Sequence, residues 1–318
     1  MIVSDVALEH YQACDLCPRV CGVNRANGEV GICGATDKLV LGRAALHWWE
    51  EPCLVGEQGS GAVFFSYCPM KCVYCQNYDL AHGAGVEITS DRLRDIFLEL
   101  QNEQHAANIN LVTPTHYLPH IAQVLTQLRT EAGDCSNDGC LTIPVVYNTS
   151  GFERVQALSL VDGLVDVYLT DFKYSSVDTA QKLSRAKAYP EAALLAVSEM
   201  LRQTGAPVFD EETGLMRKGV IVRHLVLPGR IEESFEAVKC LWEHFGNDVV
   251  LSIMGQYTPL TTNGELEQYH LNEVVTPEQY ERVLEYADFL GVEDYFWQEG
   301  GSCEESFIPA FDGTGVMA

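Results

Sequence analysis

The stretch AVFFSYCPMKCVYCQNY, residues 62–78, carries a short apolar run followed directly by three cysteines. The run AVFFS is typical of a strand that is buried on both faces. Cys68, Cys72 and Cys75 follow it with the spacing C-x3-C-x2-C. Closed zinc and iron–sulfur sites take four protein ligands. Three thiols in one loop therefore indicate either a fourth ligand elsewhere in the chain or a position left open for a molecule that is not protein.

Apolar runs of the same kind recur along the chain and are separated by segments with helical periodicity, whose apolar stripes begin at Leu93, Ile121 and Phe235. Strand–helix alternation repeated this often predicts an α/β fold with a parallel sheet. The sheet is expected to form a full or partial barrel, or else an open doubly wound sheet. The further runs are INLVT from Ile109, IPVVYN from Ile143, LVDVYLTD from Leu164, GVIVRHLVL from Gly219, VVLSIM from Val249 and DYFWQ from Asp294.

The last predicted helix has well-marked ends in the sequence. Thr276 is placed to be its N-cap, Pro277 its first residue and Gln279 the partner of Thr276 in a capping box. Gly291 is expected to end it.

Polar side chains gather where the predicted strands end. In parallel α/β folds the carboxyl ends of the strands meet at one edge, and ligands bind there. The sequence therefore predicts one shared site, although His116 and His224 are each expected to be structural rather than catalytic. Besides the three cysteines, the residues at strand ends are Thr113, Thr115 and His116, Asn148 and Thr149, Asp171 and Lys173, Arg223 and His224, and Gln256 and Tyr257.

Composition narrows the class of protein. The chain has 318 residues, a formal net charge of −25 and 20 Lys+Arg against 45 Asp+Glu, which argues against nucleic acid as a partner. The sequence contains no uninterrupted apolar stretch of about 18 residues, so no membrane span is predicted. The first residues are not expected to form a signal peptide. Twelve cysteines without a secretory signal indicate metal or redox chemistry in a cytoplasmic protein.

Four more cysteines lie near the start of the chain. Cys14, Cys17, Cys21 and Cys33 have the spacing C-x2-C-x3-C-x11-C, which suits zinc or an additional iron–sulfur cluster. Unligated core cysteines are the alternative. Residues 1–59 are predicted to form a small Cys-rich metal-binding module, and residues 60–318 the barrel domain with a C-terminal extension. Cys53, Cys135, Cys140, Cys240 and Cys303 have no partner at ligand spacing.

Several motifs together resemble the radical S-adenosylmethionine (SAM) superfamily, and within it the pyruvate formate-lyase activating enzyme group. They are CPRVCGVNR, YCPMKCVYCQNY, VYNTSG, DFKY, RHLVLPG and QYTP. The resemblance implies a partial (β/α)6 TIM-like barrel and a [4Fe–4S] cluster on the three loop cysteines, with one iron open to SAM. It also implies an oxidoreductase that cleaves SAM reductively to a 5′-deoxyadenosyl radical and abstracts hydrogen from a substrate. A ferredoxin or flavodoxin is the implied electron donor, and a glycyl radical enzyme is an implied partner.

The resemblance also implies roles at the strand ends. Tyr74 would lie beside the adenine of SAM. Asn148 and Thr149 match a family motif that helps to bind a monovalent cation, although Asn148 stands where the family has an acid. The family's GGE motif, which receives the SAM amino group, is replaced by TPTHY at residues 113–117, where Thr113 is the expected substitute.

The remaining implied SAM contacts are charged. Asp171 and Lys173 match the family's D-x-K motif, and Arg223 matches a family arginine in RHLVLPG. Lys and Arg at neighbouring strand ends are suited to pair with the SAM carboxylate. Two other hypotheses stay open: a radical SAM enzyme that acts on a small molecule or peptide, and a non-enzymatic iron–sulfur or zinc protein.

Overall fold

A curved, mostly parallel sheet forms the centre of the computed structural model, which describes residues 8–130, 139–259, 264, 266–298 and 308–317. Six strands run parallel and pair in chain order. They are β2 (Ser60–Phe65), β4 (Ile109–Val112), β5 (Val145–Thr149), β6 (Val167–Asp171), β8 (Met216–Leu225) and β9 (Val250–Met254). Within the described residues, the two outer ends of the sheet do not pair with each other. The predicted partial barrel is therefore confirmed.

Three further strands extend the sheet in the antiparallel sense. β1 (Leu39–His47) pairs with β2, and β3 (Val86–Ile88) pairs with β1. The short β7 (Val208–Phe209) pairs with the start of β8. Residues 39–47, which lie inside the predicted N-terminal module, thus belong to the sheet. The run DYFWQ, predicted as a seventh strand, contributes a single bridge from Phe296 to Ser252.

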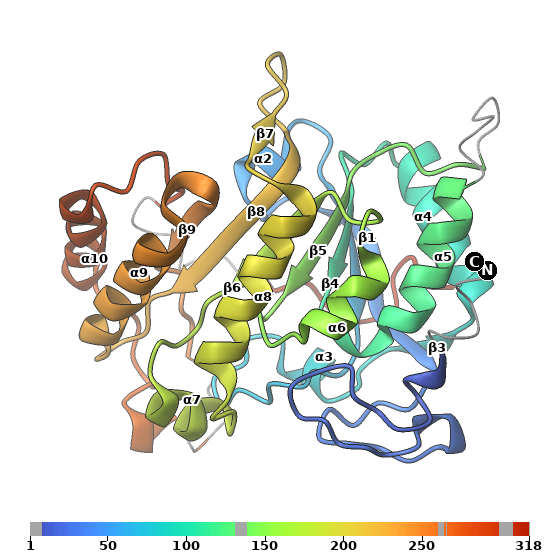
Figure 1. The fold of residues 1–318 in the computed structure, drawn as a ribbon, viewed down its shortest axis with the longest axis horizontal. Helices are drawn as coiled ribbons and strands as arrows, with labels where there is room; N and C mark the ends of the chain where they lie inside the picture. The colour runs from blue at the N-terminus through green and yellow to red at the C-terminus, as the bar shows by residue number, and fades with distance from the viewer. Residues whose placement is uncertain (1–7, 131–138, 260–263, 265, 299–307, 318) are drawn as a thin grey trace.

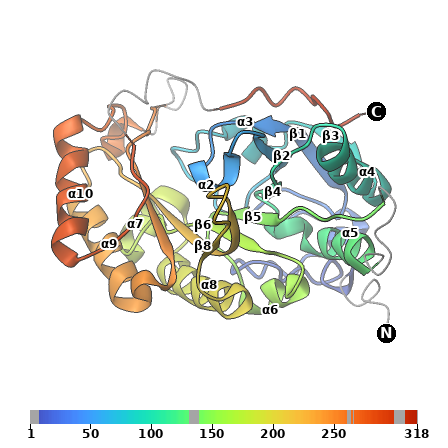
Figure 2. The same cartoon turned by 90° about the horizontal axis from the view of Figure 1, so that it is seen from above.

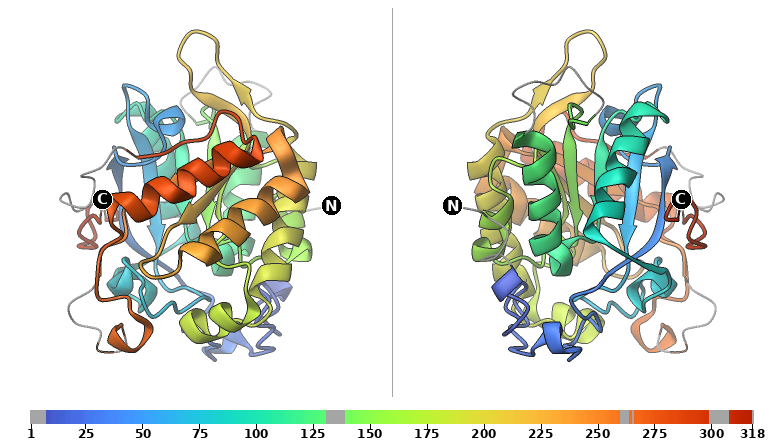
Figure 3. Two further views of the ribbon diagram at one scale, coloured as in Figure 1. Left: turned by 90° about the vertical axis from the view of Figure 1, so that its left-hand side faces the viewer. Right: turned by 90° about the vertical axis from the view of Figure 1, so that its right-hand side faces the viewer.

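Helices cover the outer side of the sheet, as Figure 2 shows from above and Figure 3 from both sides. The strands between them are buried on both faces: all residues of β2, β4 and β5 are buried. The outer helices are α4 (Ser90–Asn102), α5 (Leu118–Thr130), α6 (Val155–Leu158), α8 (Tyr189–Thr204), α9 (Ile231–Phe245) and α10 (Pro277–Leu290). α10 begins with the predicted capping box of Thr276 and Gln279 and ends at Gly291.

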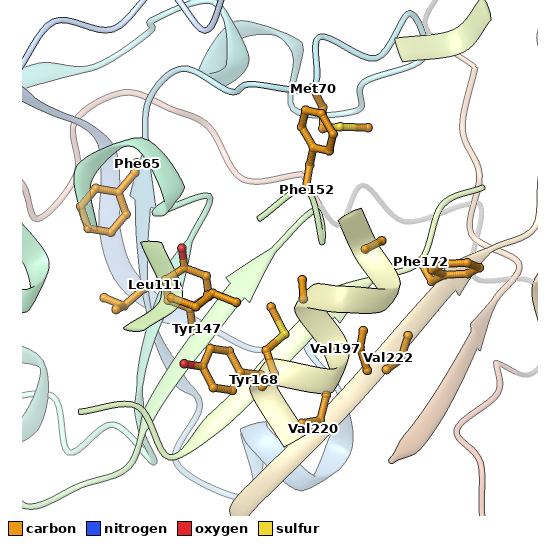
Figure 4. Close-up of a cluster of buried hydrophobic side chains, with 14 of the residues drawn as sticks. Phe65, Met70, Leu111, Tyr147, Phe152, Tyr168, Phe172, Val197, Val220 and Val222 are labelled. Carbon is orange, nitrogen blue, oxygen red and sulfur yellow. The ribbon is translucent and has the colours of Figure 1, made fainter. Parts of the chain in front are cut away.

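Two apolar layers hold the barrel together. The outer layer lies between the sheet and the helices, where Tyr147, Tyr168 and Val197 are among its side chains (Figure 4). The inner layer contains Cys53 and Leu54 of the short helix α2 (Pro52–Val55). These two residues pack against the first residues of β6, β8 and β9, so α2 closes the amino-terminal end of the barrel interior.

The N-terminal residues lie at the opposite end, beside α3 (Tyr78–Ala81) and α7 (Val177–Ser184) (Figure 1). This is the end at which the parallel strands finish. Short 3-10 turns complete the described structure: Arg25–Asn27, Thr115–Tyr117, Ser159–Val161, Gly246–Asp248 and Glu267–Tyr269. Among the described helices, none is both long and apolar enough to pass through a bilayer.

Candidate functional site

The three-cysteine loop connects β2 to α3 at the carboxyl end of the sheet. Positive φ angles at Tyr67 and Lys71 bend the chain on either side of Cys68. The Cys68 Sγ accepts a hydrogen bond of 3.4 Å from the Met70 N–H, and the Cys72 Sγ accepts one of 3.0 Å from Ser184. Donors aimed at sulfur favour the thiolate form, which is the form that binds iron.

Burial opposes the loss of the thiol protons as long as no metal is bound to the sulfurs. It raises the pKa of the Cys68 thiol to about 11, although the nearby Lys173 and two backbone N–H groups act against it. The pKa of Cys75 is raised further by burial and by its neighbours Cys72 and Cys68. Thiols of this kind lose their protons when they coordinate a metal. A cluster takes each thiolate on a different iron, so three thiols spread along one loop suit it.

Among the described residues, no group of three His, Cys, Asp or Glu side chains is arranged to hold a single metal ion.

Tyr74 belongs to a chain of hydrogen bonds that reaches Cys72. The Tyr174 hydroxyl donates to the Tyr74 hydroxyl at 2.7 Å, and Tyr174 and Ser184 share a hydrogen bond of 2.8 Å. The Tyr74 ring is buried and meets the edge of Tyr257 at 6.2 Å between ring centroids. This network fixes the cysteine loop against α7 and the end of β6.

Asp171, Lys173 and Arg223 form one buried charge cluster at the ends of β6 and β8. Asp171 and Arg223 lie opposite each other in the strand register. The Arg223 Nε donates to Asp171 Oδ1 at 2.9 Å, and the Lys173 Nζ lies 2.6 Å from Asp171 Oδ2. Burial alone would raise the pKa of Asp171, but the two cations hold it below its ordinary value. The predicted SAM-carboxylate ligands are thus brought together and are fully charged.

Asn148 joins this charge cluster and connects it to a residue that the sequence did not reveal. The Arg223 Nη2 donates to Asn148 Oδ1 at 2.8 Å, and the Asn148 Nδ2 donates to Glu50 Oε1 at 3.1 Å. Glu50 also accepts from Asn110 at 3.2 Å and lies 3.3 Å from Arg223. Burial raises the pKa of Glu50 to about 7 against the opposing effect of Arg223.

Glu50 was missed because it falls inside the predicted N-terminal module. The available signal was the string WWEEP at residues 48–52, in which two carboxylates stand beside two tryptophans. Neither periodicity nor ligand spacing singles it out.

Thr149 and Thr113 are placed differently from the charged residues. The Thr149 hydroxyl donates to Glu153 Oε1, so its side chain faces away from Asn148 and the charge cluster. Thr113 has a positive φ of 60°, and its N–H donates to the Asn148 carbonyl at 2.8 Å. The Thr113 backbone, through this hydrogen bond to Asn148, therefore lies beside the charge cluster.

His116 and His224 are bonded into the fold, as predicted. The His116 Nε2 lies 2.7 Å from the Ser66 carbonyl oxygen, and burial lowers the pKa of the ring to about 3. The His224 Nδ1 lies 2.8 Å from the Phe172 carbonyl oxygen. Gln256 connects the far end of the sheet to the cysteine loop, since its carbonyl accepts from Gln76 Nε2 at 3.1 Å.

The N-terminal cysteines lie close to the three-cysteine loop. Arg19, between Cys17 and Cys21, donates from Nε to the Pro69 carbonyl at 3.1 Å and from Nη2 to the Ser184 carbonyl at 2.9 Å. Burial raises the pKa of the Cys17 thiol to about 12, and the charges of Cys33 and Cys14 add to this effect. The two cysteine sets are thus held side by side by one arginine.

Arg25 supplies positive charge beside the same four cysteines. Its side chain is completely buried, and its Nη1 lies 3.8 Å from Cys14 Sγ. Among the side chains that the structure describes, no carboxylate forms an ion pair with Arg25. Arg25 therefore places positive charge directly beside the Cys14 thiol.

Glu153 gives a prediction about stability. It is buried, its Oε1 accepts a hydrogen bond from Thr115 at 2.6 Å, and burial raises its pKa to about 7 from the ordinary value of 4.5. Because the folded pKa is the higher one, the stabilisation is complete below pH 4.5 and is lost as pH rises through 7. We expect Glu153→Gln to remove this loss and to raise the free energy of unfolding at pH 8 by about 2 kcal/mol.

Urea denaturation at pH 5 and pH 8 measures the effect of Glu153→Gln. The difference between the variant and the wild type should shrink at pH 5, where Glu153 is mostly protonated. A variant that is less stable than the wild type at pH 8 would contradict the prediction.

Comparison with known proteins agrees with this geometry. Residues 62–239 match the family model described as Radical SAM superfamily. The uncharacterized protein MJ0674 of Methanocaldococcus jannaschii is 28% identical over 294 residues, which cover 89% of this chain and 77% of that protein. The matched family region begins in β2 and ends in α9, so it contains the cysteine loop and the charge cluster.

Solved structures of SuiB from Streptococcus suis have a similar fold. The structure bound to S-adenosylmethionine has a TM-score of 0.50 at 12% identity, over 74% of this chain and 49% of that chain. The structure bound to the precursor peptide SuiA has a TM-score of 0.45 at 13% identity, over 73% of this chain and 46% of that chain. This chain spans about half the length of the SuiB chains that it matches.

Proposed function

The chain belongs to the radical SAM superfamily, and from this premise we propose that it cleaves SAM reductively and takes a hydrogen atom from a substrate. One observation carries the proposal: the three thiols of the cysteine loop lie at the same sheet edge as the buried cluster of Asp171, Lys173 and Arg223. When bound, a [4Fe–4S] cluster and SAM supply a 5′-deoxyadenosyl radical. The residues of this chain supply position, charge and exclusion of water.

Each group at the sheet edge has a part in this proposal. Cys68, Cys72 and Cys75 hold the cluster and leave one iron open to the amino and carboxylate groups of SAM. Lys173 and Arg223 pair with the SAM carboxylate, because a buried carboxylate is stabilised by charge-assisted hydrogen bonds. Asp171 orients both cations through the contacts described above.

Tyr74 and Thr113 complete the SAM site in this proposal. Tyr74 lies one residue before Cys75 and is buried beside Tyr174. It borders the adenine. Thr113, at the end of β4, offers its backbone or side chain to the SAM amino group. A monovalent cation near Asn148 and Asp171 is a further part of the proposal, with Asp171 as the charged ligand.

We also propose a second iron–sulfur cluster at Cys14, Cys17, Cys21 and Cys33, with zinc as the alternative. The buried charge of Arg25 beside Cys14 supports a metal there. Arg19, which stands between Cys17 and Cys21 and donates to the Pro69 carbonyl of the three-cysteine loop, supports an electron path between the two sets. A low-potential ferredoxin or flavodoxin would supply the electron, and the cysteine content fits a cytoplasmic location.

Two kinds of substrate remain within the proposal. Resemblance to the pyruvate formate-lyase activating enzymes favours a backbone glycine of a large glycyl radical enzyme. A cavity lined by Arg223 of β8 favours a small molecule or a peptide side chain. The cavity is the more specific observation, so we favour the second substrate class.

The experiment that tests the proposal is anaerobic. The reconstituted protein is reduced with dithionite, and its electron paramagnetic resonance is recorded with and without SAM while 5′-deoxyadenosine is assayed. We expect a SAM-dependent change in the cluster signal together with 5′-deoxyadenosine. Iron counted in wild type and in Cys14→Ala separates the two cysteine sites. A cluster signal that ignores SAM, without 5′-deoxyadenosine, would leave a non-enzymatic metal protein instead.

A further inference from the structure

A cavity of about 210 Å³ lies between the charge cluster and the loop that precedes α2. Its wall includes Trp48, Trp49, Glu51 and Trp297, and Arg223 faces it from β8. Gln256 also lines it, and the Gln256 carbonyl accepts a hydrogen bond from Gln76, the residue after the last loop cysteine. Gln256 therefore connects the wall of the cavity to the end of the cysteine loop.

Glu51 is buried in this wall, and among the described residues its carboxylate pairs with Arg223 alone, at the long distance of an ion pair. Its side chain is 7% exposed, and its Oε2 lies 4.0 Å from Arg223 Nη1, which is too far for a hydrogen bond. Within the described parts of the chain, the Glu51 carboxylate accepts no hydrogen bond. A cation or donor that enters the cavity beside this carboxylate would form a charge-assisted hydrogen bond with it.

Among the described residues, the charged side chains around Glu51 donate no hydrogen bond to its carboxylate. Within the described residues, three carboxyl groups share two cationic side chains here, so the carboxyl groups outnumber the cations. Burial raises the pKa of Glu50 to about 7, so an entering cation would also draw this carboxyl into its charged form. The carboxylates belong to Glu50, Glu51 and Asp171, and the cations belong to Lys173 and Arg223.

Aromatic rings surround the same carboxylates. Trp48, Trp49 and Trp297 line the cavity, and each is half exposed, at 50%, 53% and 54%. About half of the surface of each of these side chains is thus accessible from outside the protein. Indole faces attract ammonium and guanidinium groups, and this attraction grows when the cation is removed from water. Carboxylates and indoles in one wall thus favour the same class of ligand.

The size of the cavity limits what it takes. At roughly 30 Å³ per water, its volume corresponds to about seven water molecules. Pockets for whole drug-sized ligands start at roughly 300 Å³. The cavity is thus large enough for one amino- or guanidino-bearing chain and too small for a folded loop.

We propose that this cavity binds the substrate of the radical reaction through an organic cation, held by Glu51 and Glu50 and covered by the three tryptophans. The inference rests on the proposed function, because it places the reacting molecule beside the cysteine loop. It adds the chemical class of the substrate: an amine or guanidine of about side-chain length, either free or on a peptide.

Intrinsic fluorescence tests the cavity directly, since three of the four tryptophans of the chain line it. The reconstituted full chain is titrated with butylammonium and butylguanidinium, and with butanol and butyrate as uncharged and anionic probes of equal length. We expect a saturable fluorescence change with the cations alone. Glu51→Gln should weaken cation binding about 10- to 100-fold. The matched control is Glu57→Gln, which removes an exposed carboxylate six residues away and should bind as wild type.

The outcomes separate this inference from the proposed function, because SAM cleavage is assayed in the same samples. Equal binding of butanol or butyrate, no saturable cation binding, or unchanged affinity in Glu51→Gln would each overturn the cation site. Displacement of the cation by SAM would overturn it as well, because the carboxylates would then belong to the SAM site. Loss of 5′-deoxyadenosine formation with intact cation binding would count against the proposed function alone.

Discussion

Replacing Cys72 with alanine should reduce SAM-dependent 5′-deoxyadenosine formation to background and remove one cluster's content of iron. Cys68, Cys72 and Cys75 are the thiols of one short loop, and two of them cannot hold three irons of a cluster. Cys72 is the thiol with a side-chain donor, since Ser184 lies 3.0 Å from its Sγ. Iron analysis, electron paramagnetic resonance with SAM and a product assay together measure the effect.

Cys240→Ala is the matched control for this loss. Cys240 is half-buried on α9, outside both cysteine sets, so its removal should leave iron content and product formation unchanged. The circular dichroism of Cys72→Ala should match that of the wild type, since the parallel strands do not depend on this side chain. Full iron content and product formation in Cys72→Ala would refute the open-iron assignment.

The barrel could be predicted from the sequence because each parallel strand is a local apolar signal. β2, β4, β5 and β6 are buried on both faces, so nearly continuous apolar runs mark them. The meeting of Asp171 and Arg223 follows from the same logic, since consecutive parallel strands bring their ends to one edge.

Thr149 shows where a motif conceals the geometry. Successive residues of a strand point to opposite faces of the sheet, so Asn148 and Thr149 cannot both face the barrel interior. Asn148 bonds with Arg223, whereas Thr149 bonds with Glu153. The alternation of side chains along a strand could have been used on the sequence to assign Asn148 and Thr149 to opposite faces of the sheet.

Glu50 and Glu51 could not be placed from the sequence for a different reason. β1 runs antiparallel to β2, with His47 opposite Ser60, so the chain returns to the amino-terminal end of the barrel. α2 then closes that end, and the two glutamates before it face inward. The pairing of β1 with β2 sets where these glutamates lie, and no local pattern in WWEEP reports that pairing.

Arg25 was likewise absent from the predicted site, although the structure makes it central to the N-terminal region. Its Nη1 donates to the His116 carbonyl at 2.7 Å, and its Nε donates to the Thr36 carbonyl at 3.2 Å. The guanidinium also lies over the Tyr11 ring, 4.6 Å from the centroid. It therefore ties the N-terminal segment to the turn that follows β4.

Arg25→Met should lower the free energy of unfolding by about 3 kcal/mol, because the buried His116 carbonyl and the part-buried Thr36 carbonyl lose their donor. Urea denaturation of wild type and variant measures this change. Arg282→Met is the matched control: Arg282 also stacks on an aromatic ring, 5.6 Å from Phe235, but it is half exposed and should change stability by less than about 0.5 kcal/mol. Equal stabilities of Arg25→Met and wild type would contradict the prediction.

The same variant separates a structural role of Arg25 from a role at the metal. If the charge of Arg25 balances metal-bound thiolates at Cys14, Cys17, Cys21 and Cys33, Arg25→Met should release that metal to a chelator faster than wild type does. Arg25→Lys, which keeps the charge but loses the guanidinium geometry, should retain the metal better than Arg25→Met while remaining less stable than wild type. Equal metal loss from the methionine and lysine variants would show that Arg25 acts through its hydrogen bonds alone.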